Sequence, residues 1–431
     1  MTQSCLAINN AGHLTIDGVD TVDIAKEYGT PAYVISEDAV RANCRAYKNA
    51  LDKYFGDGSM PLYAGKALCY RGIYKVIAEE GLGADVVSPG ELYTALKAGF
   101  PAEKIFFHGN NKTDADIDFA IESGIGYFIV DNTEELLSIE QNLASRNRTQ
   151  DILLRITPGI DPHTHKAIKT GNVDSKFGSA IATGSAKAMV KAALDCPHIN
   201  LVGLHCHIGS QIFDSKPFIE AANIMLRFLR ELKDEFSWEA KYLNLGGGFG
   251  VPYVDDDHKI DYGARIGEVA AEIERLCGEL DMKRPCILLE PGRSIVANAG
   301  ITLYTVGSVK EIPGFRTYVS IDGGMPDNPR YALYQSQYEA VIANKVSEPK
   351  TITCTIAGRC CESGDLIGEN MPLQAAERGD IMAVLVTGAY NYSMASNYNR
   401  IPRPPIVAVS DGKARLSVRR ESFDDLLKNE L

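Results

Sequence analysis

Between residues 60 and 290 the chain repeats one pattern, in which a short apolar run is followed by an amphipathic stretch. The runs are too short for helices and are rich in Val, Ile, Leu, Phe and Tyr, so they predict β-strands. There are eight, at residues 62–64, 84–87, 105–107, 127–130, 152–156, 201–207, 242–245 and 286–289. The first four begin 21 or 22 residues apart, about the length of one strand–helix unit with tight loops.

The stretch between the sixth and seventh runs has the spacing of one helix face. Its apolar residues are Phe218, Ala222, Met225, Leu229 and Leu232. Eight alternating strands and helices predict a TIM-type (β/α)8 barrel over residues 38–300, with the active site at the strand C-terminal ends. A doubly wound open sheet is the alternative. It would more often carry its ligand motif in the first strand–helix turn, whereas here the unusual residues follow several strands.

At both ends of the chain the pattern changes to alternating apolar and polar positions. Such runs lie at residues 13–18, 31–35, 301–306, 351–356 and 381–386, and residues 407–418 read as a hairpin with Asp411-Gly412 at its turn. They predict a second, mostly antiparallel β domain formed by residues 1–37 and 301–431.

Composition and charge narrow the function classes. The 431 residues are 45% hydrophobic and 23% charged, as in ordinary globular proteins. The net charge of −12 disfavours nucleic acid and anionic lipid as partners, although a local Arg and Gly cluster can still bind a small anion. We expect no membrane span and no secretory signal. The ten cysteines are scattered without a CxxC pair, which indicates reduced thiols and a cytoplasmic protein.

The first strand ends at a lysine, in Tyr63-Ala-Gly-Lys-Ala-Leu. A strand-end lysine is ordinarily a solvated surface residue. Gly65-Lys66 is not a phosphate-binding P-loop, because the preceding glycine and the following Ser or Thr are missing. Held among apolar neighbours, Lys66 would have a lowered pKa and could form a Schiff base with a carbonyl or with pyridoxal phosphate.

The sixth strand ends His205-Cys206-His207. Alternation puts His205 and His207 on one face, so a metal pair is conceivable, and His163-x-His165 is a second such pair. No third ligand has an obvious spacing, so we predict no metal site. The alternatives are a core histidine or a ring stacked on a flat ligand.

Two further strands end in residues suited to an anion. Gly246-Gly247-Gly248 would leave backbone N–H groups uncovered, as in phosphate-binding loops. The eighth strand ends Glu290-Pro-Gly-Arg293, for which a surface salt bridge is the simple alternative. Together these residues fit pyridoxal phosphate, with Lys66 for a Schiff base, a flat His207, a phosphate site at the glycines and Arg293, and Glu290 to keep the pyridine nitrogen protonated.

Ordered motifs along nearly the whole chain then become recognisable. They are Tyr63-Ala-Gly-Lys-Ala, Gly83-Ala-Asp-Val-Val-Ser-Pro-Gly-Glu-Leu, His108-Gly-Asn-Asn-Lys, Lys176-Phe-Gly, Gly203-Leu-His-Cys-His-Ile-Gly-Ser-Gln, Gly246-Gly-Gly-Phe, Glu290-Pro-Gly-Arg, Asp322-Gly-Gly-Met, Cys361-Glu-Ser-Gly-Asp and Gly388-Ala-Tyr. The chain resembles the pyridoxal-phosphate-dependent decarboxylases of the alanine-racemase-like fold. The resemblance implies a cofactor-binding barrel plus a β domain, active as a homodimer whose sites are shared between subunits.

The resemblance also implies roles for individual residues. Lys66 is then the Schiff-base lysine, His207 the residue stacked on the ring, Glu290 the partner of the ring nitrogen, and Cys361 the proton donor delivered across the dimer interface. The other cofactor-binding positions are Ser210, Gly248, Gly292, Arg293 and Tyr390. The substrate-binding positions are Arg293, Arg330, Tyr334, Glu362 and Tyr390, of which Glu362 grips the distal amino end.

The implied reaction is loss of CO2 from the D-centre of meso-2,6-diaminopimelate to give L-lysine, a small amino-acid substrate. One alternative is a related decarboxylase for ornithine, lysine or carboxynorspermidine; Arg330, Tyr334 and Glu362 together favour a substrate with both groups at its distal end. Another is a catalytically silent protein that only binds the cofactor.

Two departures from the family pattern concern substrate preference and the proton donor. The segment after Asp322-Gly-Gly-Met reads Pro326-Asp-Asn-Pro-Arg-Tyr331, where Tyr331 replaces a family Pro and adds bulk. Cys360 beside Cys361 makes the proton donor ambiguous by one residue, and the Glu-Ser-Gly-Asp register favours Cys361.

Overall fold

The structure, a computed structural model, describes residues 3–160, 174–254 and 260–431. The chain divides into two compact units. One comprises Cys44–Gly250 and Ile260–Gly292, and the other comprises Met1–Asn43, Val251–Lys259 and Arg293–Leu431. The domain boundaries at residues 38 and 300 stay predictions.

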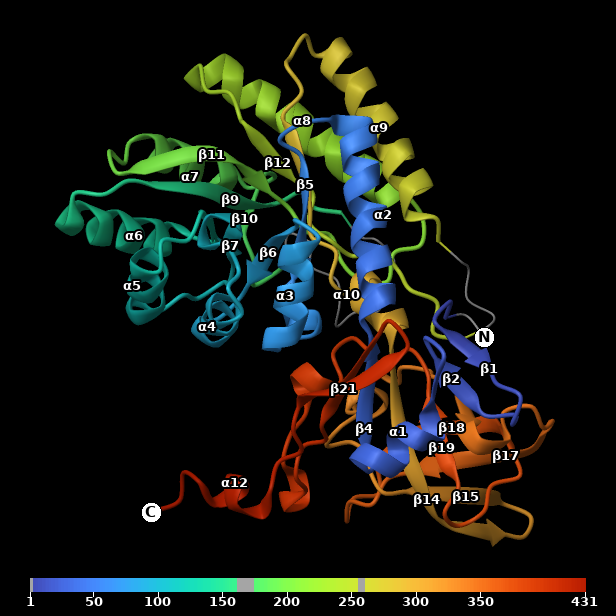
Figure 1. The fold of residues 1–431 in the computed structure, drawn as a ribbon. Helices are drawn as coiled ribbons and strands as arrows, with labels where there is room; N and C mark the ends of the chain where they lie inside the picture. The colour runs from blue at the N-terminus through green and yellow to red at the C-terminus, as the bar shows by residue number, and fades with distance from the viewer. Residues whose placement is uncertain (1–2, 161–173, 255–259) are drawn as a thin grey trace. The chain divides into compact units, whose positions relative to one another are not determined.

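The first unit is a closed barrel of eight parallel strands (Figure 1). Its strands are β5 Met60–Ala64, β6 Gly83–Val86, β7 Ile105–Phe107, β8 Tyr127–Val130, β9 Gln150–Thr157, β11 Ile199–His205, β12 Tyr242–Asn244 and β13 Cys286–Leu289. Each strand pairs with the next in this order, and β13 pairs with β5 to close the ring. The predicted (β/α)8 barrel is confirmed, and the open sheet is excluded. A short strand, β10 (Ser179–Ala180), pairs with β9 outside the ring.

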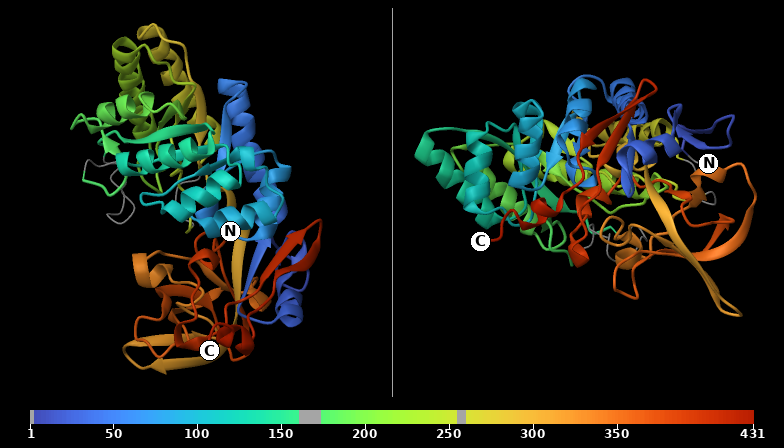
Figure 2. Two further views of the ribbon diagram at one scale, coloured as in Figure 1. Left: turned by 90° about the vertical axis from the view of Figure 1, so that its left-hand side faces the viewer. Right: turned by 60° about the horizontal axis from the view of Figure 1, so that its bottom comes forward.

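Helices lie outside the strand ring, as Figures 1 and 2 show. They are α3 Arg71–Glu79, α4 Pro89–Lys97, α5 Asp114–Glu122, α6 Thr133–Arg146, α7 Ser185–Leu194, α8 Lys216–Phe236 and α9 Tyr262–Glu279, with α2 Glu37–Phe55 preceding the first strand. The predicted apolar face is the buried face of α8. Side-chain caps explain several starts: Ser88, Thr113 and Asn132 accept hydrogen bonds from backbone amides of the first turns. Among the described residues no helix has the length and apolar character needed to span a membrane.

One buried layer of apolar side chains links the strands of the barrel. Seven strands each contribute one member: Leu62, Phe106, Ile129, Leu153, Val202, Tyr242 and Leu288. On the remaining strand, β6, a Cβ on Gly83 would lie 2.5 Å from Leu62 Cδ2, so the position has no room for a side chain. The barrel interior is therefore packed, and polar groups are confined to the strand ends.

A buried ion pair joins the loop after β7 to the first turn of α6. Lys112 Nζ lies 2.7 Å from Glu135 Oε1 and also donates to the carbonyl oxygens of Ile129 and Gly109, and both charged side chains are 2% exposed. Burial lowers the pKa of Lys112 and raises that of Glu135. The two charges are paired at a high desolvation cost, so neither tolerates loss of the other.

We therefore expect Lys112→Met to lower the free energy of unfolding by about 3–5 kcal/mol, because it leaves Glu135 buried and uncompensated. Urea denaturation would measure the loss. The double variant Lys112→Met/Glu135→Leu should recover most of it, and a single variant within about 1 kcal/mol of the parent protein would contradict the prediction.

The second unit is a mostly antiparallel β domain formed by both ends of the chain. Its main sheet runs β18-β17-β15-β14-β4-β20-β21, with β16 and β19 attached beside β14. The strands are β4 Ala32–Ser36, β14 Gly300–Ile312, β15 Arg316–Ile321, β16 Ala340–Ile342, β17 Lys350–Ala357, β18 Leu366–Gln374, β19 Ile381–Val384, β20 Ile406–Ser410 and β21 Lys413–Val418. The predicted domain is confirmed, since β4 of the N-terminal end lies between β14 and β20.

Smaller elements complete this unit. A separate three-stranded sheet consists of β1 Leu6–Ile8, β2 Leu14–Ile16 and β3 Val19–Asp20, and the helices are α1 Thr21–Tyr28, α10 Arg293–Val296, α11 Arg330–Tyr334 and α12 Phe423–Leu427. The predicted hairpin is present, with Asp411 and Gly412 at φ of 51° and 69° as a type I′ turn requires. Two pairings, β15 with β17 and β20 with β4, are parallel.

Candidate active site

The polar residues of the barrel follow directly from the strand pattern. Successive strand side chains alternate between faces, so a residue two positions beyond the apolar layer points the same way. On three strands these residues are Asp85, Arg155 and Asn244, and directly after three others they are His108, Asp131 and Glu290. The barrel thus carries a ring of titratable and amide side chains at the C-terminal ends of its strands, where barrel enzymes hold their active sites.

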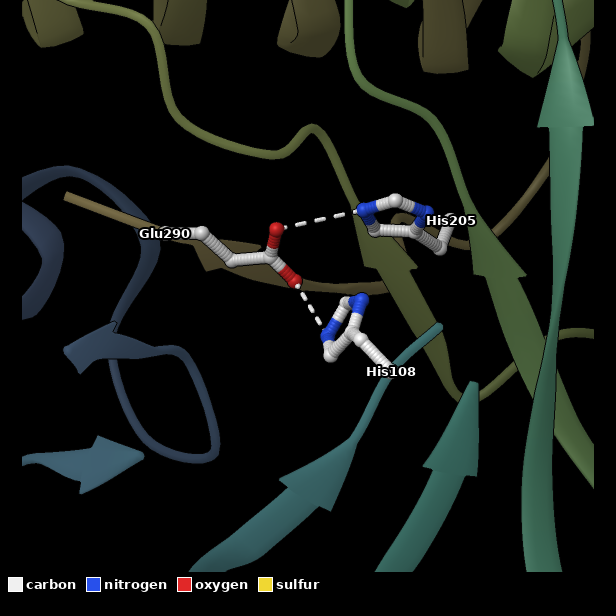
Figure 3. A group of neighbouring side chains, drawn as sticks. All are labelled: His108, His205 and Glu290. Atoms are coloured by element: carbon white, nitrogen blue, oxygen red, sulfur yellow. Dashed lines mark hydrogen bonds and ion pairs between the residues drawn. The ribbon is translucent and has the colours of Figure 1, made fainter. Parts of the chain in front are cut away.

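Glu290 is the centre of this ring (Figure 3). Its Oε1 accepts a hydrogen bond from Asn244 Nδ2 at 2.7 Å and lies 3.0 Å from His108 Nε2. Its Oε2 lies 3.2 Å from His205 Nε2. The two imidazole rings meet edge to face, with centroids 5.1 Å apart. All four side chains are buried.

The electrostatics make Glu290 an ionised carboxylate. Burial opposes its ionisation, but the contacts with His108 and His205 hold its pKa well below the usual range. Burial lowers the pKa of His205 to about 4, so His205 is neutral near pH 7 and acts as an N–H donor. A second buried carboxylate, Asp85, lies 3.7 Å from His108 Nε2, and burial raises its pKa. Of the two carboxylates, Glu290 is therefore the one favoured in its charged form.

His207 is oriented by the glycine run. The amide of Gly247 donates to His207 Nδ1 at 3.3 Å, which leaves the proton of the neutral ring on Nε2. Burial, followed by the charge of Lys66, lowers the pKa of His207 well below its usual value. Gly247 has no room for a side chain, because a Cβ there would lie 2.0 Å from the carbonyl oxygen of Glu290. His207 is therefore a neutral ring with a fixed tautomer.

The glycine run differs from the expectation of uncovered amides. Gly246 N–H donates to Asn244 Oδ1 at 2.9 Å and Gly247 N–H to His207, so these two amides serve the scaffold. Gly248 has φ of +112°, and a Cβ there would lie 2.3 Å from the carbonyl oxygen of Gly209. The close packing of two loops, rather than bare amides alone, accounts for these glycines.

Lys66 follows β5 directly, inside a short 3-10 turn over Gly65–Ala67, and its side chain is exposed. The turn adjoins the end of β13: Ala64 N–H donates to Pro291 O at 3.1 Å, and a Cβ on Gly292 would lie 2.9 Å from Ala64 Cβ. Within the barrel unit, the structure therefore brings the turn that carries Lys66 against the turn that carries Glu290 and Gly292. Ser210 is half-buried in the loop after β11.

In the β-domain unit, two predicted arginines lie among tyrosine rings. Arg293 Nη1 donates to Tyr253 Oη at 2.7 Å, and its guanidinium lies 4.8 Å from the ring centroid of Tyr390. The Arg330 guanidinium lies 5.5 Å from the rings of both Tyr334 and Tyr390. Arg330 Nε is buried and has no hydrogen-bond partner among the described residues. This donor lies among tyrosine rings and is suited to bind an anionic group of a ligand.

The loop that carries Cys361 and Glu362 is held by Asp365. The Asp365 carboxylate accepts hydrogen bonds from the amides of Met325 at 2.5 Å and Cys360 at 2.7 Å. Cys361 and Glu362 themselves are exposed in the single chain. Cys360 is half-buried, and burial together with Asp365 raises the pKa of its thiol to about 12. The two neighbouring thiols thus have different environments.

The remaining predicted features have separate outcomes. His205 and His207 do not act as a pair, because β11 ends at His205 and the two rings contact different groups. The ligand atoms that do gather are those of His108, His205 and Glu290, within 4.8 Å of one another, a group that sequence spacing did not indicate. His163 and His165 lie outside the described residues. The Tyr331 hydroxyl donates to Glu369 Oε2 on β18 at 2.7 Å, which fixes its added bulk against that strand.

Comparison with known proteins agrees with this fold. Residues 37–297 match the family described as pyridoxal-dependent decarboxylase, pyridoxal binding domain. The chain, through its barrel, therefore belongs to the pyridoxal-dependent decarboxylases.

Relatives of the whole chain narrow the class. The chain is 48% identical to a diaminopimelate decarboxylase of Bacillus methanolicus and 46% identical to one of Bacillus subtilis, covering 96–98% of this chain and 96% of each relative. The crystal structure of the M. jannaschii diaminopimelate decarboxylase in complex with L-lysine matches with a TM-score of 0.92 at 37% identity, over 100% of this chain and 98% of that one. The chain belongs to the diaminopimelate decarboxylase family.

Sequence reasoning missed the residues around Glu290. His108 and Asn244 each lie two positions beyond an apolar core residue, and Asp85 lies two positions beyond Gly83 at the matching place on β6. The signal that could have found all three is this shared offset of two residues. Two of the three, Asp85 and His108, also fall inside the quoted family motifs. No single motif reveals it, because the three residues become neighbours only when the barrel closes.

Proposed function

We propose that the protein removes the D-centre carboxylate of meso-2,6-diaminopimelate as CO2 and forms L-lysine, with pyridoxal phosphate as cofactor. The relatives that share nearly its full length are diaminopimelate decarboxylases. The observation that carries the proposal is the buried, ionised Glu290 held at the strand ends beside the turn of Lys66. An ionised carboxylate in a buried site has one evident use here, which is to stabilise a protonated nitrogen.

The residues fit the cofactor. Glu290 would hold the ring nitrogen, His207 would lie against the ring as a neutral imidazole, and Lys66 would bind the aldehyde carbon through its amine. The phosphate would be held at Ser210, Gly248, Gly292, Arg293 and Tyr390. When bound, the protonated ring supplies an electron sink for the carbanion left at the substrate Cα as CO2 departs.

Three side chains of the protein, Lys66, His207 and Cys361, would then hold the cofactor and return a proton to the substrate. The Lys66 amine would hold the aldehyde carbon of the cofactor and would give way to the amino group of the substrate. His207 carries no charge at neutral pH, so it would place no second positive charge against the protonated ring. Cys361 returns a proton to Cα; an ordinary thiol has a pKa of about 8.5 and is mostly protonated at neutral pH, so it can donate.

The distal end of the substrate would be read by Arg330, Tyr334 and Glu362. The buried Arg330 Nε, which lacks a hydrogen-bond partner among the described residues, supports a carboxylate there. Glu362 would complement the distal ammonium group. This pairing favours diaminopimelate over ornithine, lysine and carboxynorspermidine, none of which carries both an amino group and a carboxylate at one distal carbon.

We further propose that the protein is a homodimer in which both subunits contribute to each active site, and that it is located in the cytoplasm. Cys361 and Glu362 lie in an exposed run of the single chain, as expected for residues that serve a second subunit. All ten cysteines are free thiols and five of them are buried, which supports a reducing compartment.

The test is to load the purified protein with pyridoxal phosphate and to measure CO2 and lysine from meso-diaminopimelate. Ornithine, lysine and carboxynorspermidine serve as parallel substrates. No CO2 from meso-diaminopimelate would refute the proposal. Faster turnover of a parallel substrate would favour the related decarboxylases, and cofactor absorption without CO2 from any substrate would indicate a silent cofactor-binding protein.

Replacing Arg330 with Gln should raise the KM for meso-diaminopimelate roughly tenfold or more, because a charge-assisted contact to a carboxylate is lost. The cofactor absorption should not change. Arg316→Gln is the matched control, since Arg316 forms an exposed pair with Glu369 on β15 and β18. An unchanged KM in Arg330→Gln would remove Arg330 from the substrate site.

A further inference from the structure

Glu290 is surrounded by more hydrogen-bond donors than a lone partner of the cofactor needs. Asn244 and His108 face its Oε1, while His205 faces its Oε2. An ionised carboxylate cannot donate, so the hydrogen in the His205 contact belongs to Nε2 of the histidine. Two hydrogen-bond donors, on β11 and β12, and the imidazole of His108 after β7 thus converge on one carboxylate.

The two carboxylate oxygens of Glu290 have different numbers of polar neighbours. A carboxylate accepts about four hydrogen bonds, two at each oxygen. Oε1 accepts a hydrogen bond from Asn244 and also has the His108 imidazole 3.0 Å away, whereas His205 is the one group of this cluster at Oε2 among the described residues. One further N–H therefore fits at Oε2. A protonated ring nitrogen is a donor of that kind, and a neutral ring nitrogen is not.

We propose that His205, assisted by His108, is a positioning residue that keeps Glu290 ionised and turns its Oε2 toward the ring nitrogen of the cofactor, so that this nitrogen retains its proton. The inference rests on the proposed cofactor and deepens it. Neither histidine is assigned contact with substrate or cofactor; both act through Glu290.

His205 is the more decisive of the two. The Nε2 of His108 is shared with a second carboxylate, since Asp85 Oδ1 lies 3.7 Å away. His205 has Glu290 as its charged hydrogen-bond partner, and it is 1% exposed, so water does not replace it. The other charged or titratable groups whose fields reach Glu290 or Asp85 include Lys66, Glu91, Arg155, Cys206 and His207.

Two variants with an amide side chain separate the effect of the hydrogen bond to Glu290 from the effect of the imidazole ring itself. In His205→Gln the amide nitrogen takes the place of Nε2 and keeps the hydrogen bond to Glu290. In His205→Asn the shorter amide corresponds to Nδ1 and falls short of it. The pair differs in reach and not in polarity, so a merely structural need for a polar side chain would affect both alike.

The readout is the 15N NMR signal of protein loaded with pyridoxal phosphate that is 15N-labelled in the ring, recorded without substrate. We expect a protonated ring nitrogen in the parent protein and in His205→Gln, and an unprotonated one near neutral pH in His205→Asn. In parallel, kcat should fall roughly tenfold to hundredfold in His205→Asn and recover largely in His205→Gln.

His198→Asn is the control, because His198 forms a His–Glu pair with Glu140 at 2.7 Å just before the other end of β11. It should leave the ring signal unchanged. The same Gln and Asn pair at His108 keeps the test available if a His205 variant does not fold. A protonated ring nitrogen in both Asn variants, or the same loss in Gln and Asn, would overturn the inference. A protonated ring nitrogen in a protein that forms no lysine would instead refute the proposed function alone.

Discussion

Lys66→Ala is expected to lose the visible absorption of covalently bound cofactor and to lower decarboxylation by roughly a thousandfold or more, as for other residues that form a covalent link in catalysis. Lys66 lies in the turn after β5, and its charge is felt by Asp85 and His207 in the strand-end ring. Removing the amine removes the covalent link to the cofactor, whereas Glu290 and His207 would still contact the cofactor's pyridine ring. Weak, non-covalent cofactor binding should therefore persist.

A matched lysine distinguishes this role from a general charge effect. Lys104 precedes β7 at the opposite strand end and contacts the carbonyl oxygen of Gly81 at 3.4 Å. Lys104→Ala should keep both the absorption and the activity. A small primary amine added to Lys66→Ala should restore part of the turnover, which it would not do for a folding defect. Persistence of the covalent absorption in Lys66→Ala would show that another lysine holds the cofactor.

The barrel could be predicted because its strands are both buried and short. A strand buried on both faces must be apolar throughout, and the strand–helix repeat of 21 or 22 residues marked four of them directly. Strand ends could not be predicted as well. The run 201–207 continues apolar beyond His205, but Cys206 N–H makes the last ladder bond, to Asn244 O at 2.9 Å, before the chain leaves the sheet. The pairing of His205 with His207 failed for this reason.

The site could be predicted only in part for a related reason. Residues inside motifs, such as Lys66 and Glu290, identify themselves through their neighbours in sequence. Asn244 does not, because its role depends on Glu290, which is 46 residues away in the chain and 2.7 Å away in the fold. In the β domain, the parallel pairing of β15 with β17 likewise depends on which distant strands meet. Local patterns carry no information on such partners.

The two adjacent cysteines give the second large expected effect. Cys361→Ser should lower kcat by roughly a hundredfold to ten-thousandfold, the usual contribution of a general acid, with little change in KM or in cofactor absorption. A serine hydroxyl has the same reach as the thiol but is a far weaker acid. Cys360→Ser is the matched control and should stay within a few-fold of the parent enzyme.

The structure gives the physical reason for this difference. The Cys360 amide donates to Asp365 Oδ2, and burial beside that carboxylate raises the pKa of the Cys360 thiol to about 12, which makes it a poor donor near neutral pH. The Cys361 side chain is exposed, and its amide is held by Asn399 Oδ1 at 2.8 Å. An exposed thiol on an anchored backbone can be presented to a substrate, whereas Cys360 faces its own scaffold. The reverse pattern of kcat values would transfer the role to Cys360.

The same variants test whether the sites are shared. If Cys361 serves the site of the partner subunit, a dimer that combines one Lys66→Ala chain with one Cys361→Ser chain contains one intact site. Random mixing of the two inactive proteins should then regenerate about a quarter of the parent activity, since half of the dimers are mixed and each has one working site of two. Activity that stays at the level of the separate variants would mean that Lys66 and Cys361 act within one chain, and the exposure of Cys361 would need another explanation.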